Sequence, residues 1–360
     1  MGKKEIIAHL ETITPLWTGD AWQENKKIRP SSLIGSLRFW FEVICYFSGV
    51  TIKEEEFDSN KGRFEKEFNE KFNNNFCNLT NLEEKIAVLK EAKIPVPAIV
   101  FGTTGWRSMV ILKEINFYPN NFLSEPNGKI IEMKEWRWGS SSYQGEFKIT
   151  FLVEEKLAEN IFYPLLNFMN DYGYWGGKWN IGYGRLNIKT IEEKENGTIK
   201  TIDNFGSKKS FDFSIFKYDK KVDYNEELIK IVNSFTELLP NNNMNNNHKT
   251  NAPYTIRIFF PSNSKDNDLK NFEDTGDWKK IIRNLINEKS EQRSNFKRNS
   301  KDTRKENEKR HKIFGSINPP PEDKDLPQGS KILPYLKKEN EENGKYKGGF
   351  ISIVDLLNLY

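Results

Sequence analysis

Two kinds of hydrophobic pattern open the chain. Apolar and polar residues alternate over residues 5–14, and this period of two predicts a half-buried β-strand. Pro15 ends the strand, because proline has no N–H to donate to a sheet. Residues 31–48 instead repeat apolar residues at spacings of three and four, which predicts a helix with one buried stripe. The stripe consists of Leu33, Leu37, Trp40, Ile44 and Phe47.

The same patterns predict the remaining elements of the first half. We expect strands over residues 96–101, 107–117, 145–154 and 183–191, and a helix over 162–172 that starts near Pro164. Residues 53–92 are charged with apolar positions at helical spacing, which predicts a helical insertion. The order is β-α-β-β-α-β, which is typical of a ferredoxin-like unit.

The second half has a weaker pattern. It predicts a polar connection over residues 192–215, helices over 223–238 and 268–289, and strands over 253–260 and 349–354. The asparagine run at 241–247 predicts an exposed loop. We therefore predict an α+β fold of two ferredoxin-like (RNA-recognition-motif-like) domains with helical insertions. Residues 1–200 would form the first domain and residues 201–360 a degenerate second domain.

Composition narrows the function classes. A length of 360 residues suits two domains, and 55 basic against 51 acidic residues leave a net charge of only +4. Any nucleic-acid surface must therefore be local. Cys45 and Cys77 form no metal-binding pair, which argues against zinc and for a reducing compartment. No apolar stretch approaches 18 residues, so we predict a cytoplasmic protein without a membrane partner.

A glycine-rich stretch at residues 173–185 carries the strongest local signal. It holds five glycines, four aromatic residues and two cations. Glycine lets another backbone come close, while flat rings and cations suit a phosphate polymer with unstacked bases. The alternative is a hairpin turn with a few core aromatics. The candidate RNA contacts are Gly176, Lys178, Trp179, Asn180, Tyr183 and Arg185.

A second candidate is the start of the helix at 31–48. Ser31 and Ser32 stand at its N-terminus, where free N–H groups and the helix dipole favour an anion. Arg29 and Arg38 would flank that anion. Gly35 lies inside the helix, where glycine costs about 1 kcal/mol relative to alanine, and close approach of a partner backbone would explain it. The alternative is an ordinary capped helix with a surface arginine.

Together these segments resemble a known family. Residues 14–19 read Thr-Pro-Leu-Trp-Thr-Gly, residues 28–40 contain Arg-Pro-Ser-Ser-Leu-Ile-Gly-Ser-Leu-Arg-Phe-Trp, and residues 101–103 read Phe-Gly-Thr. This pattern resembles the RAMP superfamily and, within it, the first subunits of the Cmr effector complex of type III-B CRISPR systems. The glycine loop fits the superfamily pattern Gly-Φ-Gly-x5-Gly-Φ-Gly except that Tyr174 stands where the first glycine belongs.

The resemblance implies a non-catalytic, RNA-binding subunit of an RNA-guided effector complex. Its partners would be the 3′ region of a CRISPR guide RNA, the target RNA and other RAMP subunits. No cofactor and no metal are implied. Arg107 becomes a candidate RNA contact because it follows the Phe-Gly-Thr turn.

A basic run at residues 293–312 is the last candidate for RNA contact. It holds nine Lys/Arg against three acidic residues, and Arg304 and Arg310 are its candidate contacts. Neutralising several phosphates would give salt-dependent binding. The alternative is a solvated helix or a disordered insertion.

A catalytic function is the alternative at the level of the whole protein. Related RAMP nucleases activate a ribose 2′-OH without a metal, so His9 or His311 would serve in an endoribonuclease that processes repeat RNA. Asp20 resembles the aspartate of target-cleaving RAMP subunits. No phosphate-loop, zinc-protease or nucleophile-elbow motif is present.

Overall fold

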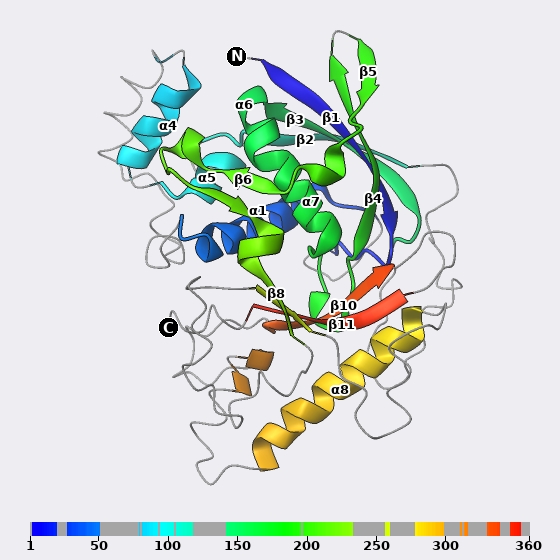
Figure 1. Cartoon of the computed structure of the whole chain (residues 1–360). Helices are drawn as coiled ribbons and strands as arrows, with labels where there is room; N and C mark the ends of the chain where they lie inside the picture. Colours follow the sequence, from blue (N-terminus) through cyan, green and yellow to red (C-terminus); the bar gives the residue numbers. More distant parts are fainter. Residues whose placement is uncertain are drawn as a thin grey trace.

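The structure is a computed structural model of the chain. It describes residues 2–19, 27–50, 79, 81–92, 94–103, 106–117, 142–195, 197–232, 256–259, 278–298, 310–311, 313–315, 330–338 and 346–353. Within these residues the protein is a mixed fold of helices and mainly antiparallel sheets (Figure 1).

Five strands form the first sheet in the spatial order β2-β3-β1-β4-β5. Every neighbouring pair is antiparallel, and β1 lies between β3 and β4. The strands are β1 (Lys3–Thr12), β2 (Val110–Phe117), β3 (Glu146–Glu154), β4 (Leu186–Glu195) and β5 (Thr198–Thr201). The alternation predicted for residues 5–14 is confirmed, because Ile6, Ala8 and Leu10 are buried.

Helices pack on the face of this sheet that carries those buried residues (Figure 1). They are α1 (Pro30–Phe47), α4 (Leu82–Glu91), α5 (Val96–Phe101), α6 (Glu155–Leu157), η1 (Ala158–Phe162) and α7 (Tyr163–Asp171). The predicted stripe of α1 is buried throughout, from Leu33 to Phe47. With β1, α1, β2, β3, α7 and β4, the predicted β-α-β-β-α-β order is observed.

A four-stranded sheet occupies the other end of the molecule, in the order β10-β11-β9-β8. Its strands are β8 (Ile229–Val232), β9 (Ile256–Phe259), β10 (Ile332–Lys338) and β11 (Tyr346–Ser352), and only β8 and β9 pair in parallel. Helix α8 (Trp278–Arg298) lies against β10 and β11 (Figure 1).

Short elements connect the two sheets. They are η3 (Phe205–Ser207), β6 (Ser210–Asp212), η4 (Ser214–Phe216), β7 (Lys221–Asp223) and η5 (Tyr224–Leu228). A further short helix, η2 (Trp179–Ile181), lies between α7 and β4. Phe211 and Phe213 stack against Phe41 of α1, so the main core continues past residue 200. The domain boundary at residue 200 stays a prediction.

Several predicted elements are wrong or displaced. Residues 96–101 form a helix, because Pro95 and Pro97 suit a helix start and the run is buried on every side, which hides its period. Residues 229–232 form β8, because pairing with β9 overrides the helical pattern predicted for 223–238. The predicted connection over 192–215 contains β5 and β6, and β10 was missed. The asparagine run at 241–247 and most of 53–92 lie outside the described residues.

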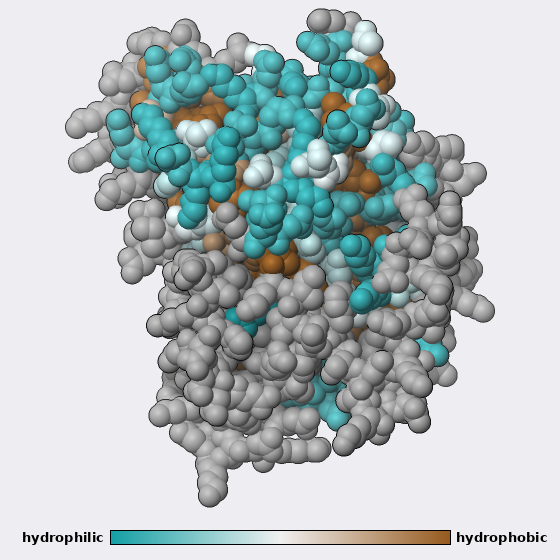
Figure 2. All heavy atoms as spheres, viewed as in Figure 1, coloured by the Kyte–Doolittle hydropathy of each residue, from teal (hydrophilic) through white to brown (hydrophobic). Residues whose placement is uncertain are grey.

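Among the residues that are coloured in Figure 2, the surface on this side is mostly hydrophilic, with small hydrophobic patches between polar side chains. Among the described residues, no helix is long and apolar enough to cross a membrane.

Candidate nucleic-acid interface

The end of β1 and the glycine-rich stretch form one unit. The N–H groups of Ile13 and Thr14 both donate to the carbonyl of Arg185, at 2.9 and 3.1 Å. The N–H of Gly184 donates to the carbonyl of Pro15 at 2.9 Å, and the N–H of Arg185 donates to Oγ1 of Thr14 at 2.9 Å. The Thr-Pro-Leu segment therefore holds the end of the glycine loop in place.

Close packing inside the protein explains the glycines of this loop. Gly176 has φ +73°, and a Cβ there would lie 2.2 Å from the carbonyl oxygen of Trp17. Gly184 has φ +87°, and a Cβ there would lie 2.0 Å from the carbonyl oxygen of Trp175. Both positions require glycine for two reasons: another backbone segment of the chain lies too close for a Cβ, and the residue has a positive φ. Gly176 is thus a structural residue, and the predicted approach of an RNA backbone does not account for it.

The loop packs directly on helix α1. The N–H of Gly176 donates to Oγ of Ser36 at 2.8 Å. The ring of Trp179 lies 5.1 Å from that of Phe39 and 6.0 Å from that of Trp40, between centroids. The glycine loop therefore packs on the second and third turns of α1.

A short segment at Trp17 and Thr18 joins the two elements. The carbonyl of Trp17 accepts from the N–H of Gly177 at 2.7 Å, and Nζ of Lys178 lies 4.7 Å from the Trp17 ring. Oγ1 of Thr18 accepts from the N–H of Arg29 at 3.0 Å. Partial burial lowers the pKa of Lys178, which also has a left-handed backbone, with φ 61°. The rest of the chain thus holds this lysine in place.

The outward stripe of α1 remains at the surface. Ser31 and Gly35 are exposed, and a Cβ built on Gly35 meets no heavy atom within 4 Å. No backbone of the described residues approaches Gly35, so the partner predicted there does not come from that part of the chain. Ser32 lies one turn earlier and is half-buried, and its carbonyl accepts from Oγ of Ser36 at 2.8 Å. Arg29 is the N-cap residue of α1, its side chain makes no capping hydrogen bond, and the first turn has no acidic residue.

Arg38 borders this stripe and ties it to the Phe-Gly-Thr turn. Its Nη1 donates to the carbonyl of Gly102 at 2.9 Å, and its Nε pairs with Glu42 at 3.0 Å. The pKa of Glu42 is raised overall, because the effect of burial exceeds the opposing effect of the Arg38 charge. The Arg38 side chain keeps 39% of its area exposed, so it can still meet a ligand while its position is fixed.

Arg185 and Tyr183 correct the predicted site. Arg185 is 1% exposed and donates to five carbonyls, those of Met169, Asn170, Asp171, Gly173 and Leu336. It closes the C-terminal end of α7, whose last carbonyls lack helical partners. Tyr183 is 3% exposed within the second apolar cluster, and burial raises its pKa to about 12. Neither side chain is free to contact RNA.

The other candidates lie in different places. Asn180 is exposed beside Lys178, and its carbonyl accepts from Nζ of Lys289 on α8 at 3.2 Å. Arg107 is exposed just after the Phe-Gly-Thr turn. Arg310 is 9% exposed and lies next to α8, away from α1. Arg304 and Asp20 lie outside the described residues.

The two histidines of the enzyme hypothesis lie far from each other in the fold. Nε2 of His9 pairs with Glu192 at 3.0 Å, on the sheet face opposite to the buried residues of β1. Nε2 of His311 lies 3.1 Å from Nη2 of Arg310. Neither histidine borders the outward stripe of α1. No group of three or more potential metal ligands occurs among the described residues.

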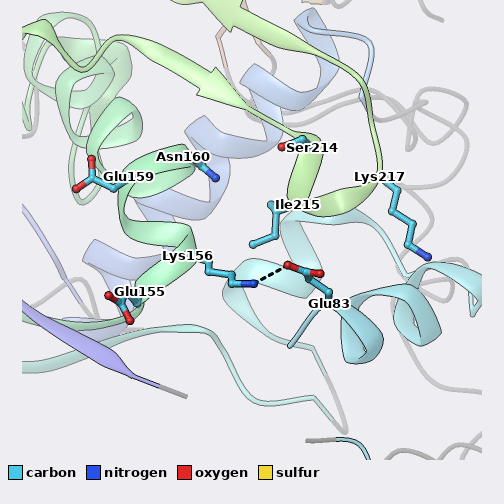
Figure 3. Close-up of a pocket in the computed structure, with 8 residues that line it drawn as sticks. All are labelled: Glu83, Glu155, Lys156, Glu159, Asn160, Ser214, Ile215 and Lys217. Carbon is cyan, nitrogen blue, oxygen red and sulfur yellow. Dashed lines mark hydrogen bonds and ion pairs between the residues drawn. The ribbon is translucent and has the colours of Figure 1, made fainter. Parts of the chain in front are cut away.

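A polar pocket of about 520 Å³ lies elsewhere, between α4, the α6–η1 segment and η4 (Figure 3). Lys156 and Glu83 form an ion pair across it at 2.6 Å. None of the predicted site residues lines this pocket.

Sequence reasoning missed several residues of this surface. Trp17, Thr18 and Phe39 belong to the motifs that carry the family resemblance, but none of them is among the predicted RNA contacts. The signal for Phe39 was available, because it stands one turn after Gly35 on α1. Lys289 gave no signal, since only tertiary packing brings it to Asn180.

The sequence was compared with models of protein families and with curated proteins. A family model described as the RAMP superfamily matches residues 9–187. No curated protein matches the sequence.

Solved structures are similar over nearly the whole chain. The crystal structure of apo Cmr1 from Pyrococcus furiosus has 16% identity and a TM-score of 0.39, covering 98% of this chain and 92% of that one. A chain in a cryo-EM structure of type III-B Cmr-beta bound to cognate target RNA has 14% identity and a TM-score of 0.44, covering 97% and 94%. A further Cmr-beta structure, with cognate target RNA and AMPPnP in the presence of single-stranded DNA, gives 12% and 0.42, with 99% of both chains covered.

Proposed function

This chain belongs to the RAMP superfamily, and from that premise we propose that it is a non-catalytic RNA-binding subunit of a type III-B CRISPR effector complex. Its partners would be guide RNA, target RNA and other RAMP subunits in the cytoplasm. We further propose that the two sheets belong to two ferredoxin-like domains. The first sheet supports this with its β2-β3-β1-β4 order and all-antiparallel pairing.

One observation carries the proposal. Four motif segments that are far apart in the sequence meet around the outward stripe of α1. Trp17 accepts a hydrogen bond from the glycine loop, and Thr18 accepts one from Arg29 at the start of α1. Within α1, Ser36 accepts a hydrogen bond from Gly176, and Arg38 donates one to the carbonyl of Gly102. The sequence features that resemble the Cmr first subunits therefore build one surface.

The chemistry of this surface suits a single RNA strand. Lys178, Arg38 and Arg29 supply positive charge, and the uncapped start of α1 favours an anion. Phe39 and Trp179 are half-buried rings in contact with each other, and they offer a face on which a base can stack. Gly35 leaves open space through which a phosphate backbone can reach the helix.

Substitutions at Gly35 test this surface without removing any contact inside the protein. We expect Gly35→Glu to weaken binding of single-stranded RNA about tenfold, since it places bulk and negative charge where phosphate would lie. Gly35→Gln separates bulk from charge and should weaken binding less. Affinity is measured by fluorescence anisotropy at several salt concentrations.

Gly35→Ala is the matched control for folding. It meets no atom within 4 Å and should stabilise α1 by about 0.5–1 kcal/mol in urea unfolding. If Gly35→Glu folds normally and binds RNA as tightly as the unaltered protein, the surface is assigned wrongly.

The same binding experiment addresses catalysis. RNA recovered after incubation with chelator should remain intact. Cleavage that disappears in His9→Ala or His311→Ala would instead establish the endoribonuclease alternative and contradict the non-catalytic assignment.

A further inference from the structure

Three cations converge beside helix α8, outside the surface just described. Lys289 and Arg293 are one turn apart on the same face of α8. Arg310 approaches this face from the short turn at residues 310–315, and Nη2 of Arg293 lies 3.5 Å from the carbonyl of Gly315 in that turn. We call Lys289, Arg293 and Arg310 the α8 cation cluster; Figure 1 shows α8 beside β10 and β11.

The cluster has no counter-charge. None of its three side chains forms an ion pair with a carboxylate among the described residues. On the first sheet, by contrast, Lys4, Lys113 and Lys194 each form an ion pair with a glutamate. Within the described part of the chain, the groups that contact the cluster are the Asn180 carbonyl at Lys289, the Gly315 carbonyl at Arg293 and the His311 ring at Arg310.

Burial makes this arrangement unfavourable for the empty protein. Arg310 is 9% exposed, and its Nε is buried without a hydrogen-bond partner. Burial and the nearby Arg293 lower the pKa of both Arg310 and Lys289, the latter to about 7. Bringing like charges together while removing water raises the free energy of the charged forms. An anion at the centre would offset the repulsion between the like charges and would accept hydrogen bonds in place of the water that burial removes.

We propose that the α8 cation cluster is a second RNA contact, which binds a phosphate group of the same strand that lies on α1. Guanidinium groups match the geometry of a phosphate, and two of the three members are arginines. This inference rests on the proposed function for the identity of the ligand. The cluster itself is observed independently of α1.

The glycine loop connects the two surfaces. Trp179 packs against Phe39 of α1, and Nζ of Lys178 lies over the Trp17 ring. The next residue, Asn180, accepts a hydrogen bond from Lys289 of the cluster. Gly182 lies against Ile282 of α8, where a Cβ would come within 2.7 Å of the Ile282 Cδ1 atom. A strand that leaves Trp179 therefore meets Lys289 first and then Arg293 and Arg310.

Charge-neutral variants of the full chain test the cluster. We expect Arg310→Gln and Lys289→Gln each to weaken binding of a single-stranded RNA oligonucleotide about three- to tenfold. Each should also lower the slope of log affinity against log salt by about 0.7, the value for one phosphate contact on a single strand. Arg283→Gln is the matched control, because Arg283 is an exposed arginine on α8 outside the cluster face. It should leave both quantities nearly unchanged.

A measurement with free phosphate shows whether the cluster binds a phosphate group of RNA or a free phosphate ion. Inorganic phosphate or pyrophosphate should raise the melting temperature of the unaltered chain, and Arg310→Gln should abolish that effect. If phosphate stabilises the chain but neither variant weakens RNA binding, the cluster is a site for a free anion and the RNA assignment is overturned. Lys289 is only half-buried, so Lys289→Gln keeps the test open if Arg310→Gln does not fold.

Failure of this inference is distinguishable from failure of the proposed function. If Gly35→Glu weakens RNA binding and both cluster variants do not, the cluster inference is wrong and the α1 surface stands. If the cluster variants alone weaken binding, the cluster stands and the α1 surface is wrong. An unaltered chain that binds no RNA contradicts both.

Discussion

Two buried arginines of this protein have opposite surroundings. Arg185 lies between the rings of Tyr174 and Tyr335, 5.5 and 5.0 Å away, and donates to five backbone carbonyls. Arg310 is buried beside another arginine, and its Nε has no partner. Both stand in basic or glycine-rich sequence that predicts RNA contact. Only the second has donors left to offer.

The difference teaches how to distinguish structural from functional cations. A buried cation whose N–H groups all meet acceptors stabilises the fold, since each removed acceptor would become an unsatisfied group. A buried cation with like charge beside it and a free donor raises the free energy of the empty protein. Such an arrangement is typical of a binding site, where a ligand supplies the missing charge.

Removing Arg185 should have the largest effect on stability. Arg185→Met removes one donor from each of five carbonyls, three of them at the end of α7, so we expect a loss of about 3 kcal/mol or more in urea unfolding. Arg185→Lys should recover only a small part, because an ammonium group cannot reach five carbonyls. Arg107→Met, at an exposed arginine, should change stability by less than about 0.5 kcal/mol. A small loss for Arg185→Met would remove the structural role assigned to it.

Removing Arg310 should have the opposite sign. In phosphate-free buffer without RNA, Arg310→Met should leave stability unchanged or raise it by about 1 kcal/mol, because it removes an unpaired buried charge. Thermal unfolding measures the difference. A loss as large as that for Arg185→Met would show that Arg310 also holds the fold, and the contrast between the two arginines would disappear.

The smallest expected effect is a pH dependence of RNA binding. The pKa of Lys289 is lowered to about 7 by burial and by Arg293, so this lysine loses its charge as the pH rises from 6 to 8. The groups that face it are Arg293 on α8 and the uncharged Asn180 carbonyl of the glycine loop. RNA affinity should therefore fall about two- to fivefold over that range.

Lys289→Arg provides the control, because arginine keeps its charge across these pH values. His311 contacts Arg310, so the comparison is made in a His311→Gln background. An equal pH dependence in both chains would contradict the assignment to Lys289.

Much of the first sheet was predictable from the sequence. β1, β3 and α1 follow clear periods of two and of 3.6, since each has one buried face. Residues 96–101 were not predictable in this way, because all six side chains are buried and no period remains. β8 failed for a different reason, since its strand conformation depends on β9, which follows 24 residues after β8 ends.

The candidate site was predicted in outline and corrected in detail. The motifs identified the glycine loop and α1 as candidates, and the structure brings the two together. Gly35 is exposed and Lys178 is partly exposed. The sequence could not tell which aromatics and cations of the loop face inward. Tyr183 and Arg185 share the composition of an RNA-binding loop with Lys178, but the second sheet and α7 enclose them.

By itself the sequence determined the periodic elements, their β-α-β-β-α-β order and the family of the first half, because these depend on local hydrophobic spacing and short motifs. Only the tertiary structure decided at which glycines another backbone segment approaches closely and at which the space stays open. It also decided which arginine has hydrogen-bond acceptors for its donors and which cations converge beside α8. Those properties depend on atoms brought together from distant parts of the chain. Burial and hydrogen bonding, which separate a structural cation from a binding one, exist only once the chain is folded.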